Sequence, residues 1–225
     1  MKPRIAILAA LPREITPLVK GWPVRKRIRN ESILIAECDR AIAVCAGMGR
    51  ERVTRALEIA ESCGPLRMVL SVGYAGGLHA GMETNALSWP AAVVDAETGQ
   101  HFACETGSGT LVTTDHVVDH KEKLLLAKLW NADLVDMEAA TVAKLAQARG
   151  LPFRALRVVS DDFQEVLPDF NRFTNARGEF REAAFAGYVV LHPWMIPTAI
   201  RIGLHTARAS QTMAKALREL LEQAE

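Results

Sequence analysis

The sequence predicts an α/β fold, a three-layer α/β/α arrangement around a central mixed, largely parallel sheet. Short apolar strands alternate with helical segments along the chain, which is the pattern of such folds. Residues 68–72 form an apolar run interrupted only by Ser71, as expected for a strand that is covered on both faces. The 225 residues, 49% of them hydrophobic, suffice for one core, and no repeat or linker divides them. We therefore expect a single domain over residues 1–225, with an apolar C-terminal helical segment at 179–225.

The predicted elements follow in chain order. Residues 5–11 form a first buried strand, and Pro12 suits the first turn of a helix after it. Further strands are expected at 33–37 and 41–46, joined by a hairpin turn, and at 68–72, 91–95, 110–114, 134–135 and within 153–162. Helices are expected at 51–63, 121–130, directly after Glu138, at 179–190 and at 205–225, with a polar connection over 164–177.

Charge and composition exclude several classes of function. The formal net charge is +1 with acids and bases interspersed, so we expect no nucleic-acid partner. The four cysteines have no paired spacing, which is typical of a reduced protein of the cytoplasm. No stretch reaches the roughly 18 apolar residues of a membrane span. The apolar run at 5–11 is too short for a signal peptide and is interrupted by Pro12, so a cytoplasmic location is predicted.

Acidic residues follow three of the predicted strands. Glu14 follows the first, Asp136 and Glu138 follow residues 134–135, and Asp161 and Asp162 end the last. Ligands of open α/β sheets bind at the carboxyl ends of strands, where partial desolvation raises carboxyl pKa values. The simpler interpretation is that these acids cap helices. Spacing alone leaves catalysis and capping equally supported.

Two glycine motifs and a histidine pair have alternative interpretations. Gly47-Met48-Gly49-Arg50 lacks the third glycine of a dinucleotide fingerprint, but its turn can present N–H groups to an anion or a hydroxyl. The segment 73–77 permits close approach of a flat or sugar-like ligand, or is a loop that needs positive φ. His116 and His120 have no third strong ligand nearby, so no metal is expected.

Five motifs in this order carry a family resemblance. They are residues 6–14 (AILAALPRE), 47–50 (GMGR), 73–78 (GYAGGL), 135–140 (VDMEAA) and 157–161 (RVVSD). Together they resemble the nucleoside phosphorylase superfamily and, within it, the methylthioadenosine/S-adenosylhomocysteine nucleosidases. The resemblance covers residues 5–162, and the paired Met-Glu and Ser-Asp motifs are its most specific part.

The resemblance implies a role for each matching residue. Asp161 matches the general acid that protonates purine N7 and accepts from the 6-amino group, so it favours adenine as the leaving base. Glu138 matches the acid that binds the ribose hydroxyls, and Met137 matches the residue packed beneath the sugar. Glu14 matches the carboxylate that deprotonates the attacking water, with Arg157 nearby. The remaining substrate-binding positions that the resemblance implies are Tyr74, Ala75, Gly76, Val117, Val118 and Ser160.

The nucleophile is either water or phosphate. Phosphorylases of this superfamily usually carry an arginine just before the loop that corresponds to Gly73, and this chain has Ser71-Val72 there. Because Glu14 is present for water, hydrolysis is favoured. Gly47, Gly49 and Arg50 form a candidate anion or water site. Arg13, Arg50 and Arg52 could serve an anion and keep phosphate as an alternative co-substrate, and no other cofactor is expected. The resemblance also implies a small-molecule nucleoside as partner and a homo-oligomer, a dimer.

Two departures from the nucleosidases bear on the substrate. The chain between Gly77 and Asp115 is shorter, which implies a wider pocket for a bulkier 5′ group. Residues 188–204 are unusually apolar, and with residues 167–173 they resemble the hopanoid-associated members, which are proposed to remove adenine from a lipid-linked adenosine. This segment is expected to cover the pocket mouth or to contact a membrane surface. Packing on the core or an oligomer face is the favoured alternative.

A non-catalytic nucleoside-binding protein is the alternative from a different class, since a fold does not determine a function. A protein that only binds nucleosides is expected to lose Glu14 or Asp161 while keeping Glu138. All three acids are present, which favours an enzyme.

Overall fold

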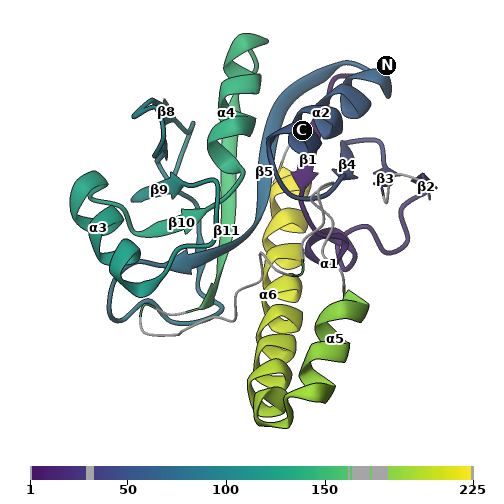
Figure 1. Cartoon of the computed structure of the whole chain (residues 1–225). Helices are drawn as coiled ribbons and strands as arrows, with labels where there is room; N and C mark the ends of the chain where they lie inside the picture. The colour runs from purple at the N-terminus through teal and green to yellow at the C-terminus, as the bar shows by residue number, and fades with distance from the viewer. Residues whose placement is uncertain (1, 29–32, 162, 164–172, 174–181, 224–225) are drawn as a thin grey trace.

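The computed structural model describes residues 2–28, 33–161, 163, 173 and 182–223. Figure 1 shows the chain with its helices and strands labelled. The elements are β1 (Arg4–Ala9), α1 (Pro12–Ile15), β2 (Val24–Ile28), β3 (Ile33–Glu37), β4 (Ala41–Cys45), α2 (Arg50–Ser62), β5 (Leu66–Gly77), β6 (Leu87–Ser88), β7 (Ala92–Asp95), β8 (His101–Ala103), β9 (Thr110–Thr113), α3 (His120–Trp130), β10 (Leu134–Asp136), α4 (Ala139–Ala148), β11 (Phe153–Asp161), α5 (Glu182–Leu191), the 3₁₀ helix η3 (Pro193–Met195) and α6 (Ile196–Gln223).

The strands of the described residues form one mixed sheet. Its order is β2-β3-β4-β1-β5-β10-β9-β7-β8, and β11 pairs with β5 and β6. The pairs β1–β4, β1–β5, β5–β11, β9–β10 and β7–β9 are parallel. The pairs β2–β3, β3–β4, β5–β10, β6–β11 and β7–β8 are antiparallel. The predicted fold class, an α/β fold around a central mixed, largely parallel sheet, is confirmed.

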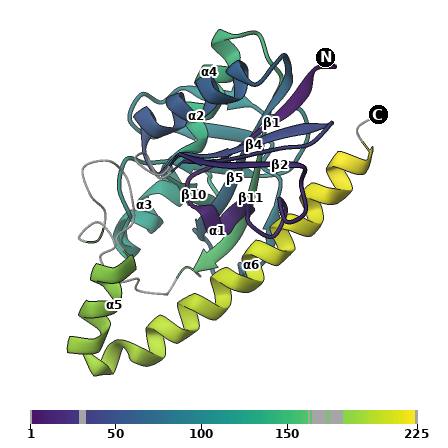
Figure 2. The same ribbon diagram turned by 90° about the vertical axis from the view of Figure 1, so that its right-hand side faces the viewer.

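Helices cover both faces of this sheet (Figures 1 and 2). Helices α2 and α4 pack side by side on one face, where Leu57 and Val142 are buried against strand residues such as Val69. On the other face, α1 and the C-terminal half of α6 share a core with β1, β4, β5 and β11. Residues of α6 that face the sheet recur every three or four positions: Ala209, Met213, Leu217 and Leu221. Helix α3 packs beside β9 and β10.

Strand β5 divides the sheet, and this division positions the site. Its first half pairs with β1, with Leu8 opposite Ser71, while its last residues, Gly76 and Gly77, pair with β10. The segment 73–77, for which a loop with positive φ was one interpretation, is instead the end of a strand, and none of its glycines has a positive φ. The missing side chain at Gly73 lets Glu14 pack closely against the strand, because a Cβ added there would lie 3.2 Å from Glu14 Oε1.

Several element boundaries differ from those expected. The strands β2, β6 and β8 were not predicted, and α6 begins at Ile196, nine residues before the expected start. Pro197 lies in the first turn of α6, where proline costs no hydrogen bond. The predicted polar connection over 164–177 lies outside the described residues, apart from Phe173.

The C-terminal segment extends away from the sheet as a helical hairpin of α5, η3 and the first half of α6 (Figure 2). Large apolar side chains are exposed on it: Leu191, Trp194, Ile200 and Leu204. We call these four residues the apolar tip. None of the helices in the described parts of the chain combines the length and the hydropathy that crossing a membrane requires.

Candidate active site

A cavity of about 170 Å³ lies where the ends of several strands meet. Strand β1 leads into α1 with Glu14, β10 leads into Met137 and Glu138, and β11 ends in Ser160 and Asp161. The lining residues are Ala10, Leu11, Glu14, Met48, Tyr74, Ala75, Gly76, Thr114, His116, Val117, Val118, Lys123, Val135, Asp136, Met137, Glu138, Ser160 and Asp161. All of the predicted substrate-binding residues are therefore brought together around one cavity.

Glu14 is held by the start of α1. Its Oε2 accepts hydrogen bonds from the backbone N–H of Ala10 at 2.9 Å and of Leu11 at 2.8 Å. These contacts fix one carboxylate oxygen and leave Oε1 beside Gly73. Burial raises the pKa of Glu14, opposed by these N–H groups and by the charges of Arg13 and Arg157. A fixed carboxyl with a raised pKa suits a base that operates near neutral pH.

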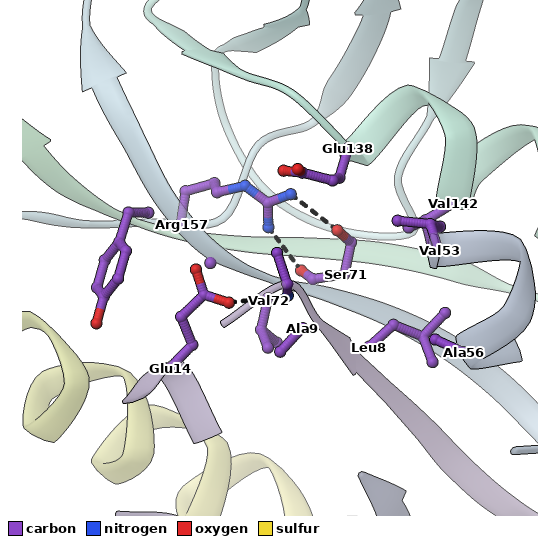
Figure 3. Close-up of a pocket in the computed structure, with 13 residues that line it drawn as sticks. Leu8, Ala9, Glu14, Val53, Ala56, Ser71, Val72, Glu138, Val142 and Arg157 are labelled. Carbon is purple, nitrogen blue, oxygen red and sulfur yellow. Dashed lines mark hydrogen bonds between the residues drawn. The ribbon is translucent and has the colours of Figure 1, made fainter. Parts of the chain in front are cut away.

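A second, inner cavity of about 20 Å³ lies behind Glu14 (Figure 3). Glu14, Glu138, Ser71 and Arg157 line it together with apolar side chains from β1, α2 and α4. This volume holds about one water molecule, and the lining supplies the polar partners that such a water needs. Glu14, Glu138 and Tyr74 also line the larger cavity, so the two spaces adjoin.

Arg157 is buried, with 2% of its surface exposed, and all five of its N–H groups are engaged. Its Nε and Nη2 donate to Asp136 Oδ2 at 3.1 and 2.5 Å. Its Nη1 donates to the carbonyls of Ser71 and Leu156, and Nη2 also donates to Ser71 Oγ at 2.8 Å. The side chain therefore contributes positive charge to the inner cavity while its hydrogen bonds go to the protein.

Asp136 is the partner of Arg157 and also holds the start of α4. Its Oδ2 accepts from the backbone N–H of Ala139 at 2.9 Å, and its Oδ1 accepts from Thr113 Oγ1 at 2.6 Å. The hypothesis that Asp136 caps the helix near Glu138 is confirmed. Both of its oxygens are engaged with the protein.

Glu138 immediately precedes α4, and its carboxylate faces the turn before α2. The backbone N–H of Gly49 donates to Glu138 Oε1 at 3.3 Å. The predicted anion-binding turn thus binds a carboxylate of its own chain. Burial, together with the charges of Asp136 and Glu14, raises the pKa of Glu138 to about 8. Glu138 is therefore mostly protonated in the ligand-free protein at neutral pH.

The raised pKa of Glu138 predicts a pH-dependent effect of Glu138→Gln on stability. Between the usual pKa of 4.5 and about 8, only the unfolded chain releases the proton, so wild-type stability falls as pH rises through this window. The glutamine is neutral at every pH. We expect the melting temperature of the variant, minus that of wild type, to increase between pH 5 and pH 8.5 in thermal denaturation. Exposed Glu222→Gln should show no such trend, and a constant difference for Glu138→Gln would contradict the pKa.

The other end of the larger cavity contains a buried ion pair. Lys123 of α3, 4% exposed, places Nζ 2.6 Å from Asp161 Oδ2. Ser160 Oγ donates to Asp161 Oδ1 at 2.6 Å. A Cβ added at Gly76 would lie 3.1 Å from Asp161 Oδ2 and 3.5 Å from Lys123 Cε, so the glycine makes room for the pair. Lys123 was not predicted from the sequence.

Tyr74 joins the cavity to α6. Its hydroxyl lies 2.7 Å from Ser210 Oγ and 3.3 Å from the carbonyl oxygen of Thr206. Burial raises the pKa of Tyr74 to about 12, and the nearby charge of Glu14 acts in the same direction. The ring contributes to the cavity wall, while the hydroxyl is committed to the helix.

The remaining predicted residues lie beside the cavity. Gly47 and Gly49 have φ values of 107° and 93°, which glycine tolerates best, and their turn leads into α2. The guanidinium of Arg50 forms an ion pair with exposed Glu97. Gly47, Gly49 and Arg50 are not among the residues that line either cavity.

The histidine pair near α3 is accounted for by local contacts. His116 lies 2.6 Å from Asp115 Oδ1 and 2.9 Å from Glu122 Oε1, which raises its pKa. Asp119 caps α3 by accepting from the backbone N–H of Glu122. Within the described ranges, no three His, Cys, Asp or Glu side chains are grouped closely enough to hold a metal ion.

The fold of the chain is similar to that of known proteins. A family model described as the phosphorylase superfamily matches residues 92–186. A solved structure of a mutant 5′-methylthioadenosine/S-adenosyl homocysteine nucleosidase (MTAN) of Helicobacter pylori contains 5′-methylthioadenosine in its active site. It superposes on this chain with a TM-score of 0.72 at 18% identity, and the match covers 99% of this chain and 100% of that chain. The protein has the phosphorylase-superfamily fold.

Other solved structures agree with this phosphorylase-superfamily fold. The 5′-methylthioadenosine/S-adenosyl homocysteine nucleosidase (MTAN) of Campylobacter jejuni has a TM-score of 0.72 at 18% identity and covers 99% of this chain and 100% of that chain. A mutant futalosine hydrolase of Helicobacter pylori has a TM-score of 0.70 at 18% identity, with the same coverage. No curated protein sequence matches the chain. The resemblance to the nucleoside phosphorylase superfamily, inferred from the sequence motifs, is confirmed.

Proposed function

We infer that the protein hydrolyses the N-glycosidic bond of a 5′-substituted adenosine, of the methylthioadenosine or S-adenosylhomocysteine type or bulkier. The observation that carries this proposal is one cavity lined by three separately held acids. Glu14 and Glu138 adjoin the inner cavity, while Asp161, with Lys123, lines only the larger one. Nucleoside cleavage needs functions that match this arrangement: activation of a nucleophile, binding of the ribose hydroxyls and neutralisation of the departing base.

Glu14 is assigned to the water and Glu138 to the sugar. The inner cavity has room for about one water beside Glu14. A glutamate that is neutral in the free protein can donate to one ribose hydroxyl and accept from the other. Met137 adjoins Glu138 in the lining, and Val117 and Val118 come from the loop after β9. Asp161 and Ser160 are assigned to the purine.

Four observations favour water over phosphate as the nucleophile. The inner cavity has the size of a single water, and it adjoins Glu14, which repels an anion when it is ionised to act as the base. The five N–H groups of Arg157 are engaged with the protein. The N–H of Gly49 faces Glu138, and Arg50 is paired with Glu97. We therefore assign Arg157 to stabilising the ionised form of Glu14 through its positive charge, and not to contacting the substrate.

The apolar tip supports a second candidate, a lipid-linked adenosine. Leu191, Trp194 and Leu204 expose between 55% and 76% of their surface on the projecting hairpin. Such side chains suit contact with an apolar 5′ substituent, a membrane surface or a second subunit. In this version the same cavity cleaves adenine from a hopanoid-type nucleoside, with phosphate as the alternative co-substrate. A dimer, a peripheral membrane contact and a cytoplasmic location stay predictions.

Adenine release from 5′-methylthioadenosine, with and without phosphate, tests the proposal. We expect release at the same rate in phosphate-free buffer and in millimolar phosphate, with free methylthioribose as the co-product in both, measured by chromatography. Release that requires phosphate and yields a ribose 1-phosphate would make the protein a phosphorylase. Binding of methylthioadenosine without release under either condition would favour the nucleoside-binding alternative.

A further inference from the structure

Lys123 places a buried ammonium group inside the substrate cavity. It is 4% exposed, lines the larger cavity, and has Nζ 2.6 Å from Asp161 Oδ2. Lys128 and Lys121 on the same helix are exposed. Burying an ammonium group is costly even when it is paired, so a buried lysine in a ligand cavity calls for a chemical explanation.

The hydrogen bonds of Asp161 bear on which residue carries the proton for the departing base. Both of its carboxylate oxygens accept hydrogen bonds, Oδ2 from Lys123 and Oδ1 from Ser160. An acid that donates to a purine must instead carry a proton on one of these oxygens. Of this ion pair, the ammonium group of Lys123, which also lines the larger cavity, carries the proton that can be transferred.

The edge of adenine fits this pair of charges. It presents N7, which accepts a hydrogen bond, next to the 6-amino group, which donates one. An ammonium and a carboxylate side by side supply the complementary donor and acceptor. A 6-oxopurine presents two acceptors, N7 and O6, so its O6 would face the carboxylate without a hydrogen bond between them.

We propose that Lys123 is the proton donor to N7 of the departing adenine, and that Asp161 acts as a carboxylate that accepts from the 6-amino group. This inference rests on the proposed function and changes the acid within it. As the C1′–N9 bond breaks, its electron pair moves onto the purine, and the Nζ–H proton is transferred to N7. Water attacks C1′ and gives its proton to Glu14. Adenine leaves neutral, and the amine and Glu14 then regain their resting states by proton exchange with solvent.

Lys123→Arg and Lys123→Gln test the proposal with two leaving groups. Arginine keeps the charge beside Asp161 but is not deprotonated in proteins, and glutamine removes the charge. For 5′-methylthioadenosine we expect both variants to lose kcat by on the order of 10²- to 10⁴-fold, the usual contribution of a general acid. For the matching 4-nitrophenyl 5-methylthioriboside, whose phenolate departs without a proton, we expect kcat within about threefold of wild type, as for a residue whose only role is proton donation. Lys121→Gln, on the exposed side of α3, is the matched control.

The possible outcomes separate the inference from the function it rests on. Full activity of Lys123→Arg on methylthioadenosine would overturn it, because the charge alone would then suffice. Equal losses on both substrates would overturn it as well, since they would indicate a structural role. A wild-type protein that cleaves neither compound would instead overturn the proposed function. Calorimetry with free bases adds a readout without turnover: we expect wild type to bind adenine more tightly than hypoxanthine and Asp161→Asn to lose that preference.

Discussion

Glu14→Gln is expected to abolish hydrolysis while leaving the fold and base binding intact. The glutamine can keep its side-chain oxygen on the N–H groups of Ala10 and Leu11, but it cannot take a proton from water. We expect kcat for adenine release to fall on the order of 10²- to 10⁴-fold, the usual contribution of a general base. Burial raises the pKa of Glu14, so the neutral replacement should not lower the melting temperature at pH 8.

The affinity for free adenine provides the control for Glu14→Gln. Glu14 adjoins the inner cavity, whereas the base is assigned to Asp161, so calorimetry should give the same dissociation constant for adenine in the variant and in wild type. A variant that retains turnover within a few fold would contradict the assignment of the water to Glu14. Equal losses of adenine affinity and of turnover would instead indicate that the whole cavity had changed.

Asp161→Asn is expected to lower both turnover and stability, for separable reasons. Turnover should fall by orders of magnitude because the asparagine cannot act as a carboxylate toward the base, whichever residue supplies the proton. Stability should fall by about 3–5 kcal/mol, because Lys123 would keep a buried charge without its anion. Chemical denaturation measures the second effect, and single-turnover adenine release measures the first.

The double variant Lys123→Gln/Asp161→Asn distinguishes the two effects. It removes both charges, so most of the lost stability should return while the activity does not. Recovery of activity together with stability would show that the pair acts only by holding the cavity in shape. Unchanged turnover in the single Asp161→Asn variant would refute the role of Asp161 altogether.

Local patterns in the sequence were enough to single out three acids that line the larger cavity. Glu14 follows β1 and Asp161 ends β11, and both strands run parallel to β5, so their carboxyl ends lie at the same edge of the sheet. Glu138 follows β10, which pairs antiparallel with the last residues of β5, so its place beside the other two acids depends on the pairing of β10 with β5. Asp136 could be interpreted either as a catalytic acid or as a cap, and only its contacts with Thr113 and Ala139 show that it caps α4.

The sequence failed where the outcome depends on contacts between distant elements. Lys123 stands among His120, Lys121 and Glu122 at the start of a helix, which is the pattern of a solvated face. Its partner Asp161 is 38 positions away, and only the packing of α3 beside the end of β11 brings the two together. Strand β2 was missed for a related reason, since its charged residues at 25–27 suit an edge strand but resemble a loop.

The full engagement of Arg157 has a consequence for how the chain can vary. Its donors end on Asp136, on Ser71 and on a carbonyl of its own strand, so three strands share a single guanidinium. Replacing any one of these partners leaves a buried donor or a buried charge without a match, at a cost of about 1–3 kcal/mol or more. Positions 71, 136 and 157 are therefore energetically coupled, and we expect the effects of substitutions at these three positions on stability to be non-additive.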